Sequence, residues 1–433
     1  MALAAAGISG GAASAAAGPA ARTKAQWQAD IRHVREPGTG CFRASYPALR
    51  WHSARCVTAP MIPLVPGPLP RSARHARPAV VGSGDNDYSA RVPGLISDAT
   101  GTFEDVSPGV TEQGDVKTGS TLTANAFSLQ LNSQTFTGSP ACSKSSKPSG
   151  CLAWQQFVYD YINPSTSIVF MQYWLINYDA GCPSGWHPPS SGSSDCLANS
   201  SPADVSTLTA SQLATVQLSG SASSGGLDSV EMSVGSGQAT SVTNSDSTVD
   251  LASFWDTTEW GVYGDGNGDE AFFGAGATLQ AQTALTATST SAPSCIKESF
   301  TGETNNLSLT STPALGGQSS PTMATRQTDG TAGTASCSVA SGADVVTVTA
   351  PGTQTTKKGT AVSLQIHATD SASGQKLTYS ATGLPAGLSI NPATGLISGT
   401  PTTLQSATVR VTAKDTTGAS GSTSFGWIIY LNK

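Results

Sequence analysis

The segment 383–401, GLPAGLSINPATGLISGTP, constrains the local fold more than any other part of this 433-residue chain. Residues 388–390 alternate apolar and polar side chains, as one strand of a sheet does, and residues 396–397 resume the apolar pattern. The residues that separate the two runs include the turn formers Asn391, Pro392 and Gly395. The segment therefore predicts a β-hairpin inside a small sandwich.

The same segment resembles the signature of the putative-Ig (cadherin-like) module of secreted bacterial proteins. The surrounding block, 343–433, has the size of one Ig-like sandwich, and apolar residues recur at every second position along 362–366 and 425–431. This block contains no cysteine, so its core is predicted to hold without a disulfide. The resemblance implies an extracellular spacer or binding domain.

Charged residues are sparse in this chain, at 12% of all positions, and the net charge is −6. Globular proteins average roughly 25% charged residues, so hydroxyl groups rather than ions supply much of the polarity here. The sequence has no run or stripe of Lys and Arg, and nucleic acid is therefore not expected as a partner.

Eight cysteines fall into four neighbouring pairs along the chain. Their proximity predicts disulfides at Cys41–Cys56, Cys142–Cys151, Cys182–Cys196 and Cys295–Cys337. A zinc site is the competing interpretation, but the sequence has no Cys-x-x-Cys and its histidines do not cluster near the cysteines. Disulfides indicate an oxidising compartment, so a secreted or cell-envelope protein is expected.

The N-terminal part is predicted to be a leader followed by a tethered motif. Residues 1–18 are apolar and rich in small side chains, which is typical of a partial signal sequence, and a disordered Ala/Gly tail is the alternative. Residues 19–84 are interpreted as a mini-motif with a Pro-rich linker at 60–78. No apolar run of about 18 residues or more is present, so the sequence predicts no transmembrane segment.

The central block, 85–341, is rich in short alternating runs and nearly free of helical periodicity. Residues 126–131 and 168–177 are two such runs, and Gly-rich turn sequences at 223–226 and 264–268 separate others. The predicted fold class is all-β, with a disulfide-stapled β-sandwich or jelly-roll domain followed by a smaller Ig-like β-sandwich.

Aromatic residues crowd two of the predicted strands, 155–159 and 170–178. Tyr and Trp rings on strands mostly fill a core, but exposed rings stack on sugars and anchor protein contacts. We interpret one set of rings as a face that binds a ligand, namely Trp154, Tyr159, Tyr173 and Trp174.

The same region shows a distant likeness to the secreted glutamic peptidases, which are β-sandwich enzymes of the eqolisin type. The matching elements are Gln155 in WQQFVY, the strand FMQYWLINY, and Glu259 in TTEWGVYGD. The resemblance implies a Gln/Glu dyad that acts at acid pH, with Glu259 as general base on water and the amide at the oxyanion.

The assignment of the glutamine in this likeness depends on strand register. Phe157 stands where the family has a glycine two residues after its glutamine, and Gln156 is the alternative to Gln155. Neighbouring residues of a strand point to opposite faces, so only one of the two can serve. A structural Gln and Glu within the sheet is the competing interpretation.

Acidic residues point to calcium at two places. The sequence DGNGDE at 265–270 places oxygen ligands as at the start of a calcium loop, but it lacks the later Gly and Glu of an EF-hand, which favours a plain hairpin tip. Asp370 and Asp415 each follow a predicted strand, and cadherin-like modules bind calcium near strand ends. The sequence therefore predicts weak calcium binding at most, and no other cofactor.

These features favour a secreted extracellular or cell-envelope binding or adhesion protein without catalysis, in which the Ig-like module is a spacer or an adhesive contact. The expected partner is an extracellular glycan or protein, and a monomer is expected. The alternative function is a divergent acid-acting glutamic-type peptidase that uses Gln155 and Glu259. A purely structural envelope component is the third class, which full burial of the aromatic rings would favour.

Overall fold

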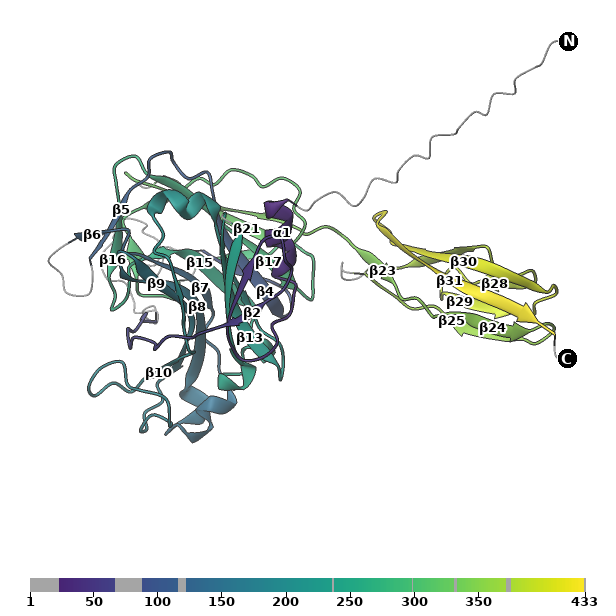
Figure 1. The fold of residues 1–433 in the computed structure, drawn as a ribbon, viewed down its shortest axis with the longest axis horizontal. Helices are drawn as coiled ribbons and strands as arrows, with labels where there is room; N and C mark the ends of the chain where they lie inside the picture. The colour runs from purple at the N-terminus through teal and green to yellow at the C-terminus, as the bar shows by residue number, and fades with distance from the viewer. Residues whose placement is uncertain are drawn as a thin grey trace, which may run out of the picture.

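The structure, a computed structural model, describes residues 23–66, 88–115, 122–235, 237–297, 299–330, 333–370 and 375–431. Regular structure in these residues is almost entirely β-strand and is divided between two bodies (Figure 1). The predicted all-β fold class is confirmed. The expected leader at 1–18 and most of the Pro-rich linker lie outside the described residues.

The central body is built on two large sheets. The ten-stranded sheet has the order β2-β1-β14-β13-β12-β4-β17-β21-β20, with β22 paired to β21. Its strands are β1 (Gly40–Ser45), β2 (His52–Ala54), β4 (Ile96–Glu104), β12 (Val216–Ser221), β13 (Leu227–Val234), β14 (Gln238–Ser245), β17 (Thr278–Ala287), β20 (Ser308–Thr310), β21 (Thr322–Thr328) and β22 (Cys337–Ala340). The eight-stranded sheet has the order β10-β9-β8-β7-β15-β3-β18, with β11 paired to β9. Its strands are β3 (Ser89–Arg91), β7 (Ser128–Ser133), β8 (Leu152–Asn163), β9 (Thr166–Ile176), β10 (Cys196–Asn199), β11 (Ala203–Val205), β15 (Thr257–Tyr263) and β18 (Ser294–Ile296).

A smaller sheet and short helices complete the central body. The sheet has the order β19-β16-β5-β6. Its strands are β5 (Glu112–Asp115), β6 (Leu122–Ala124), β16 (Glu270–Phe273) and β19 (Thr304–Asn305). The helices are α1 (Lys24–Ile31) and the 3-10 turns η1 (Pro140–Lys144), η2 (Pro148–Gly150), η3 (Ala210–Thr215), η4 (Asp246–Thr248) and η5 (Leu251–Ser253).

Alternation along its strands gives the eight-stranded sheet an inner face, toward the ten-stranded sheet, and an outer face. On β7, Leu131 joins the apolar core between the two large sheets, and Asn132 points to the outer face. On β8, Phe157 points inward in the same way and Gln156 outward. Every residue of β7 is nevertheless buried. The outer face is therefore covered by other segments of the chain.

Two glycines allow large rings to pack between the sheets. A Cβ on Gly101 of β4 would lie 2.1 Å from the Trp260 ring, and a Cβ on Gly220 of β12 would lie 2.3 Å from the Phe157 ring. Contacts this short exclude a side chain at either glycine in this arrangement. The space between the large sheets is tightly packed around these two rings.

Residues 23–66 belong to the central body rather than to a tethered motif, which differs from the expected division at residue 84. Strand β1 pairs along its whole length with β14. Trp27 and Ile31 of α1 pack against Phe42 and Trp51 in a satellite core beside that strand. An isolated hairpin is marginal in water, so β1 and β2 gain stability by extending an existing sheet.

The four disulfides expected from cysteine proximity are confirmed. They join Cys41 to Cys56, Cys142 to Cys151, Cys182 to Cys196 and Cys295 to Cys337. Their sequence separations run from 9 to 42 residues. Each disulfide therefore closes a local loop, and each restricts the unfolded chain only over that loop.

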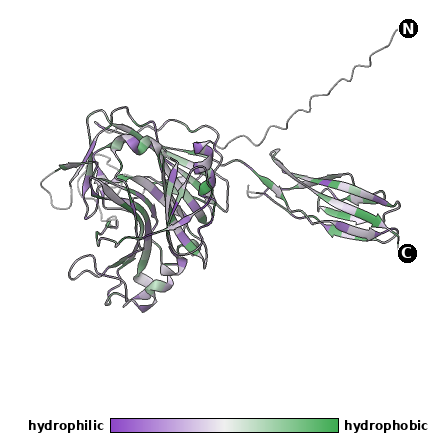
Figure 2. Cartoon of the chain, viewed as in Figure 1, coloured by the Kyte–Doolittle hydropathy of each residue, from purple (hydrophilic) through white to green (hydrophobic). Residues whose placement is uncertain are grey.

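The C-terminal body contains a two-stranded, a four-stranded and a three-stranded sheet. Their strands are β23 (Val346–Val348) with β26 (Ala368–Asp370); β24 (Gln354–Lys357), β31 (Ser420–Tyr430), β30 (Gln405–Lys414) and β27 (Thr378–Thr382); and β25 (Val362–Gln365), β29 (Leu396–Gly399) and β28 (Leu388–Ile390). Hydrophobic and hydrophilic residues are interspersed along the strands of both bodies (Figure 2).

The hairpin predicted from 383–401 is present as β28 and β29. The Asn391 side chain accepts hydrogen bonds from the amides of Ala393 and Thr394, and Gly395 adopts a φ of 72°. This turn brings β29 back beside β28, so that Ile397 enters the core with Trp427. The core of this body holds without a disulfide, as predicted.

Candidate functional site

Gln155 lies on the inner face of the eight-stranded sheet, away from Glu259. Its side-chain amide donates to Oδ2 of Asp228 on β13, at 3.0 Å, across the space between the large sheets. Glu259 on β15 accepts from Asn132 Nδ2 at 2.9 Å on the outer face. The predicted pair Gln155 and Glu259 is therefore wrong as a shared site, because the two side chains lie on opposite faces of one sheet.

The outer face carries a row of polar side chains in direct cross-strand register. The register places Asn199, Gln172, Gln156, Asn132 and Glu259 opposite one another on β10, β9, β8, β7 and β15. We call these five residues the polar row. The alternative glutamine, Gln156, is thus the one that shares a face with Glu259.

Hydrogen bonds connect the polar row into one network. Gln156 Nε2 donates to Gln130 Oε1 at 2.9 Å, and Asn132 Nδ2 donates to the same oxygen at 3.4 Å. Asn132 then bridges to Glu259, which also accepts from the Phe300 amide at 3.2 Å. Four of the five side chains in the row are fully buried. A buried polar network of this kind is stable only when its members find partners.

The aromatic rings proposed as an exposed ligand face are buried. Trp154 and Trp174 pair across β8 and β9 on the outer face, with ring centroids 6.4 Å apart, under the side chains of Val65 and Phe300. Tyr159 and Tyr173 point inward to the core between the sheets. The exposed face formed by Trp154, Tyr159, Tyr173 and Trp174 is therefore a wrong prediction, because alternation divides these rings between two covered faces.

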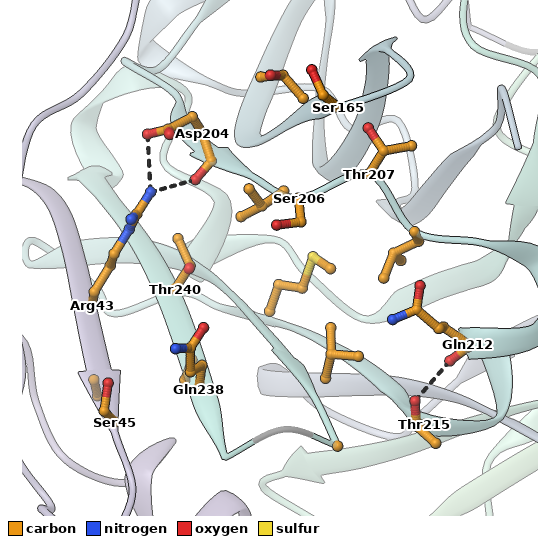
Figure 3. A pocket seen from close by; sticks show the side chains of 18 residues that line it. Arg43, Ser45, Ser165, Asp204, Ser206, Thr207, Gln212, Thr215, Gln238 and Thr240 are labelled. Atoms are coloured by element: carbon orange, nitrogen blue, oxygen red, sulfur yellow. Dashed lines mark hydrogen bonds and ion pairs between the residues drawn. The ribbon is translucent and has the colours of Figure 1, made fainter.

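An open pocket of about 680 Å³ lies where β1, β13 and β14 meet β11 and the segment that follows it (Figure 3). We call it the seam pocket. Its polar lining is rich in hydroxyl and amide groups, including Ser45, Thr207, Gln212, Gln238 and Thr240. Met232, Val234 and Leu208 add an apolar part to the wall. Sequence reasoning missed this pocket, because residues far apart in the chain line it.

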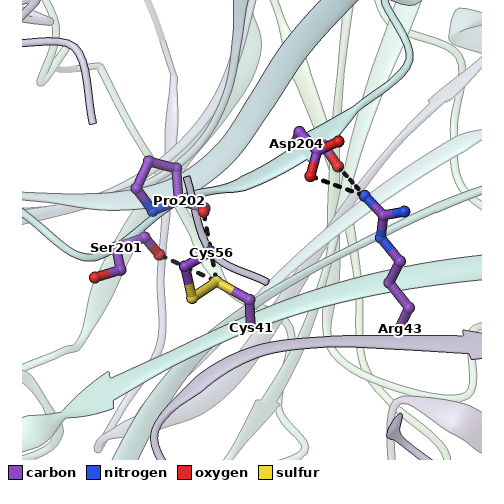
Figure 4. Close-up of polar contacts among 6 residues, drawn as sticks. All are labelled: Cys41, Arg43, Cys56, Ser201, Pro202 and Asp204. Carbon is purple, nitrogen blue, oxygen red and sulfur yellow. Dashed lines mark hydrogen bonds and ion pairs between the residues drawn. A yellow bond between two sulfur atoms is a disulfide. The ribbon is translucent and has the colours of Figure 1, made fainter. Parts of the chain in front are cut away.

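One wall of the seam pocket is held by an ion pair and lies near a disulfide. Arg43 Nη2 contacts Asp204 Oδ1 at 3.0 Å and donates to the Asp204 carbonyl at 2.7 Å (Figure 4). Two residues before Arg43, the Cys41 sulfur lies 3.4 Å from the Pro202 carbonyl oxygen. An oxidised sulfur has no proton to donate, so this is a packing contact. Both contacts join β1 to residues in or next to β11.

Three aspartates lie close together in the C-terminal body, just before β23, at the end of β26 and just after β30. One carboxylate oxygen from each of Asp344, Asp370 and Asp415 lies within 4.8 Å of the others. The structure thus brings together Asp370 and Asp415, which the sequence offered as weak calcium ligands, and adds Asp344, which no local pattern indicated; calcium binding here stays a prediction. The Thr417 hydroxyl lies between two of them, 2.7 Å from Asp415 Oδ2 and 3.0 Å from Asp344 Oδ2.

The pKa values of two members of this acidic trio change in opposite directions. Burial and a hydrogen bond with Asp415 raise the pKa of Asp344, whereas the hydrogen bond from the Thr417 hydroxyl lowers the pKa of Asp415. The other predicted acidic loop, 265–270, connects β15 to β16, and these strands lie in different sheets, so the expected hairpin tip is wrong. There Asp265 is fully buried and the next three residues have positive φ.

Burial raises the pKa values of five carboxyl groups in the described part of the central body, namely Asp98, Glu112, Asp228, Glu231 and Glu303. Burial raises the pKa of Asp228 to about 8, and the charge of Asp246 adds to the effect. Burial likewise raises the pKa of Glu112 to about 8 and that of Glu303 to about 7. These groups hold a proton in the folded protein at a pH where the unfolded chain has released it.

Comparisons with known proteins identify the C-terminal body alone. Residues 343–430 match the family model described as "Putative Ig domain", which confirms the Ig-like assignment. No curated protein matches the chain. None of the helices in the described part of the chain has the length and hydropathy needed to cross a lipid bilayer.

Among solved structures, the chain is similar to one described as a "putative alpha-galactosidase" from Bacteroides fragilis. The identity is 24% and the TM-score 0.18, and the match covers 20% of this chain and only 17% of that one. It is also similar to domains EC22-24 of mouse cadherin-23, at 13% identity and a TM-score of 0.18, over 77% of this chain and 86% of that one. These comparisons do not show the resemblance to glutamic peptidases.

We expect the free energy of unfolding to fall as the pH rises from about 5 to 8. Asp228, Glu112 and Glu303 bind protons more tightly in the folded state, so each removes up to ~1.4 kcal/mol of stability per pH unit between its unfolded and folded pKa values. Urea unfolding at pH 5, 6, 7 and 8 measures the slope. Asp228→Asn should flatten it, and Glu104→Gln, at an exposed carboxyl of β4, should not. A stability that rises over this range contradicts the assignment.

We expect calcium to bind the acidic trio weakly. Ca²⁺ prefers about six to eight oxygen ligands, and the trio with the Thr417 hydroxyl offers four groups on one side. With a Kd of about 1 mM, 10 mM Ca²⁺ would add about 1.4 kcal/mol, a shift of a few degrees in Tm. Calorimetry of the full chain tests this, with Asp415→Asn as the variant that should lose the shift. An equal shift in that variant places the ion elsewhere.

Proposed function

We propose that this protein is a non-catalytic extracellular or cell-envelope binding protein. The seam pocket takes a polar ligand of the saccharide class, and the Ig-like body acts as a spacer or adhesive contact. The observation that carries the proposal is the lining of the seam pocket, in which hydroxyl and amide groups surround an apolar wall. Four disulfides and an Ig-like body are typical of extracellular proteins and support the compartment.

The chemistry of the seam pocket favours binding over catalysis. Hydroxyls and amides both donate and accept hydrogen bonds, which matches the mixed donors and acceptors of a sugar. Met232 and Val234 supply the apolar surface that the C–H face of a sugar ring contacts. Asp204 is the single carboxyl group among the lining residues, and Arg43 already pairs with it. The pocket therefore has no free acid–base pair for hydrolysis.

The Ig-like body offers a second contact surface beside the C-terminal end of β31. Leu404, Ile428, Tyr430 and Leu431 are large apolar residues that stay exposed there. Exposed aromatic and aliphatic side chains of this kind anchor protein contacts. This supports an adhesive role for the module beside its role as a spacer.

The proposal predicts which variants lose ligand. A glycan array probed with the full chain would identify a saccharide ligand, and titration calorimetry would give its Kd. Gln238→Ala together with Thr240→Val removes two polar groups from the seam pocket, and we expect a loss of at least about tenfold in affinity.

Two control variants separate the possible contact sites. Thr408→Val removes an exposed hydroxyl from β30 and should leave the affinity unchanged. Tyr430→Ser tests the exposed apolar surface beside the C-terminal end of β31. If Tyr430→Ser abolishes glycan binding and the pocket variant does not, the ligand belongs to the module and the pocket proposal is wrong.

An acid-acting peptidase is the second candidate, because Gln156 and Glu259 share the outer face of the eight-stranded sheet. The cover over this face argues against open access for a substrate. We therefore expect no cleavage of denatured protein by the intact chain between pH 3 and 7. Cleavage that Glu259→Gln abolishes and Glu104→Gln retains would establish the peptidase instead.

A further inference from the structure

A Pro-rich segment crosses the outer face of the eight-stranded sheet. It comprises residues 57–66, VTAPMIPLVP, and we call it the strap. Its first residue follows Cys56, which the disulfide to Cys41 ties to β1, and the Val57 amide donates to the Pro202 carbonyl at 2.8 Å. Prolines recur at every third position in the strap, at Pro60, Pro63 and Pro66. This spacing is typical of peptides recognised in the polyproline II conformation.

Side chains of the polar row bind the backbone of the strap. Gln172 makes a two-way contact, in which its Oε1 accepts from the Leu64 amide at 2.8 Å and its Nε2 donates to the Ile62 carbonyl at 2.9 Å. Asn199 Nδ2 donates to the Pro60 carbonyl at 3.1 Å. The row thus forms hydrogen bonds with the main chain of the strap. Such backbone contacts can hold an extended peptide largely independently of its side chains.

A second group of residues holds the far end of the strap. The Glu303 carboxylate accepts from the Val65 amide at 3.0 Å, and the Val65 carbonyl accepts from the Gly302 amide at 2.9 Å. Asn267 donates its amide to the Pro63 carbonyl at 2.9 Å. Within the described residues, the strap forms strand-type pairing only at the isolated bridge between Pro66 and Thr301.

Two neighbouring side chains of the strap enter apolar sites on the sheet. Leu64 is fully buried against Val158, Ile168 and Phe170. Val65 packs against the cluster that contains the paired rings of Trp154 and Trp174. In contrast, Met61 is about half exposed, at 49%. The strap is thus anchored at a few positions and open to solvent at others, as a bound peptide is.

We propose that the outer face of the eight-stranded sheet is a binding groove for extended peptides rich in proline and branched aliphatic residues, which the strap occupies in cis. The groove contributes amide groups for the peptide backbone, one apolar site for the side chain at the Leu64 position, and a tryptophan pair for the next residue. This site is separate from the seam pocket, and the proposal requires no catalysis.

The experiment removes the strap from the proposed groove by mutation and then adds the strap sequence as a separate peptide. Residues 58–66 of the full chain are replaced by Gly and Ser at equal length, so that Cys56 keeps its disulfide. A fluorescent peptide of residues 57–66 is then titrated and followed by anisotropy. We expect the replaced chain to bind the peptide and the intact chain to bind it at least about tenfold more weakly, because a tethered strap competes at an effective concentration near 1 mM.

Matched controls assign the binding to the groove. A peptide with Asp in place of Leu64 should lose at least about tenfold in affinity, because a carboxylate would enter an apolar site. Gln172→Ala in the replaced chain should weaken binding similarly, and Gln282→Ala on β17 of the other sheet should not. A folded replaced chain that binds no peptide at millimolar concentration overturns the proposal.

Hydrogen exchange of the unaltered chain provides a test that does not depend on the replaced variant. If the strap is a cis ligand, the amides of Leu64 and Val65 should exchange through a local opening that leaves β8 and β9 protected. If these amides exchange only together with β8 and β9, or if the replaced chain does not fold, the strap is an integral part of the core. Either result would falsify the groove.

Discussion

The central body depends on how one sheet buries polar side chains on its outer face. Strands β7, β8, β9 and β15 alternate cleanly, so the row that points away from the apolar core consists of amides and a carboxylate rather than hydrophobic residues. An unsatisfied buried amide costs about 1–3 kcal/mol, and a buried charge costs more. The strap and the segment around Phe300 and Glu303 reduce this cost by bringing backbone amides and carbonyls to the row, although Asn132 Oδ1 stays buried without a hydrogen bond. The strap therefore supplies hydrogen-bond partners to Gln172 and Asn199 of the row.

The same constraint separates the two faces by chemistry. The inner face is closed by rings that pack onto Gly101 and Gly220, and its polar contact between Gln155 and Asp228 is sealed between two sheets. A ligand cannot enter there without separating the sheets. The outer face is covered by the strap, whose main chain is bound by side chains of the row, and by the segment around Phe300 and Glu303. In the described part of this body, the seam pocket is already open to a ligand, and the proposed groove would open only when the strap leaves.

Local patterns predicted the local structure of this chain well. The hairpin around Asn391 was predictable because its turn is made by adjacent residues, and the disulfides because each pair is close in sequence. Periodicity also showed that Gln155 and Gln156 point to opposite faces. It did not show which face Glu259 shares, because that depends on the registers β15–β7 and β7–β8. The burial of Trp174 and the place of Asp344 beside Asp415 likewise depend on segments far away in the sequence.

The position of Glu259 bears on both candidate functions of the outer face. Its carboxylate accepts hydrogen bonds from Asn132 and from the Phe300 amide, so its oxygens already take part in hydrogen bonds within the folded chain. A general base needs a water molecule within hydrogen-bond reach and a substrate beside it. Both require displacement of the cover, whether the chemistry is binding or hydrolysis. A peptide that replaces the strap would restore the backbone contacts to Gln172, whereas water alone would leave the apolar site of Leu64 exposed. We therefore expect the proposed groove to exchange the strap for another extended peptide rather than to stand open as a vacant cleft.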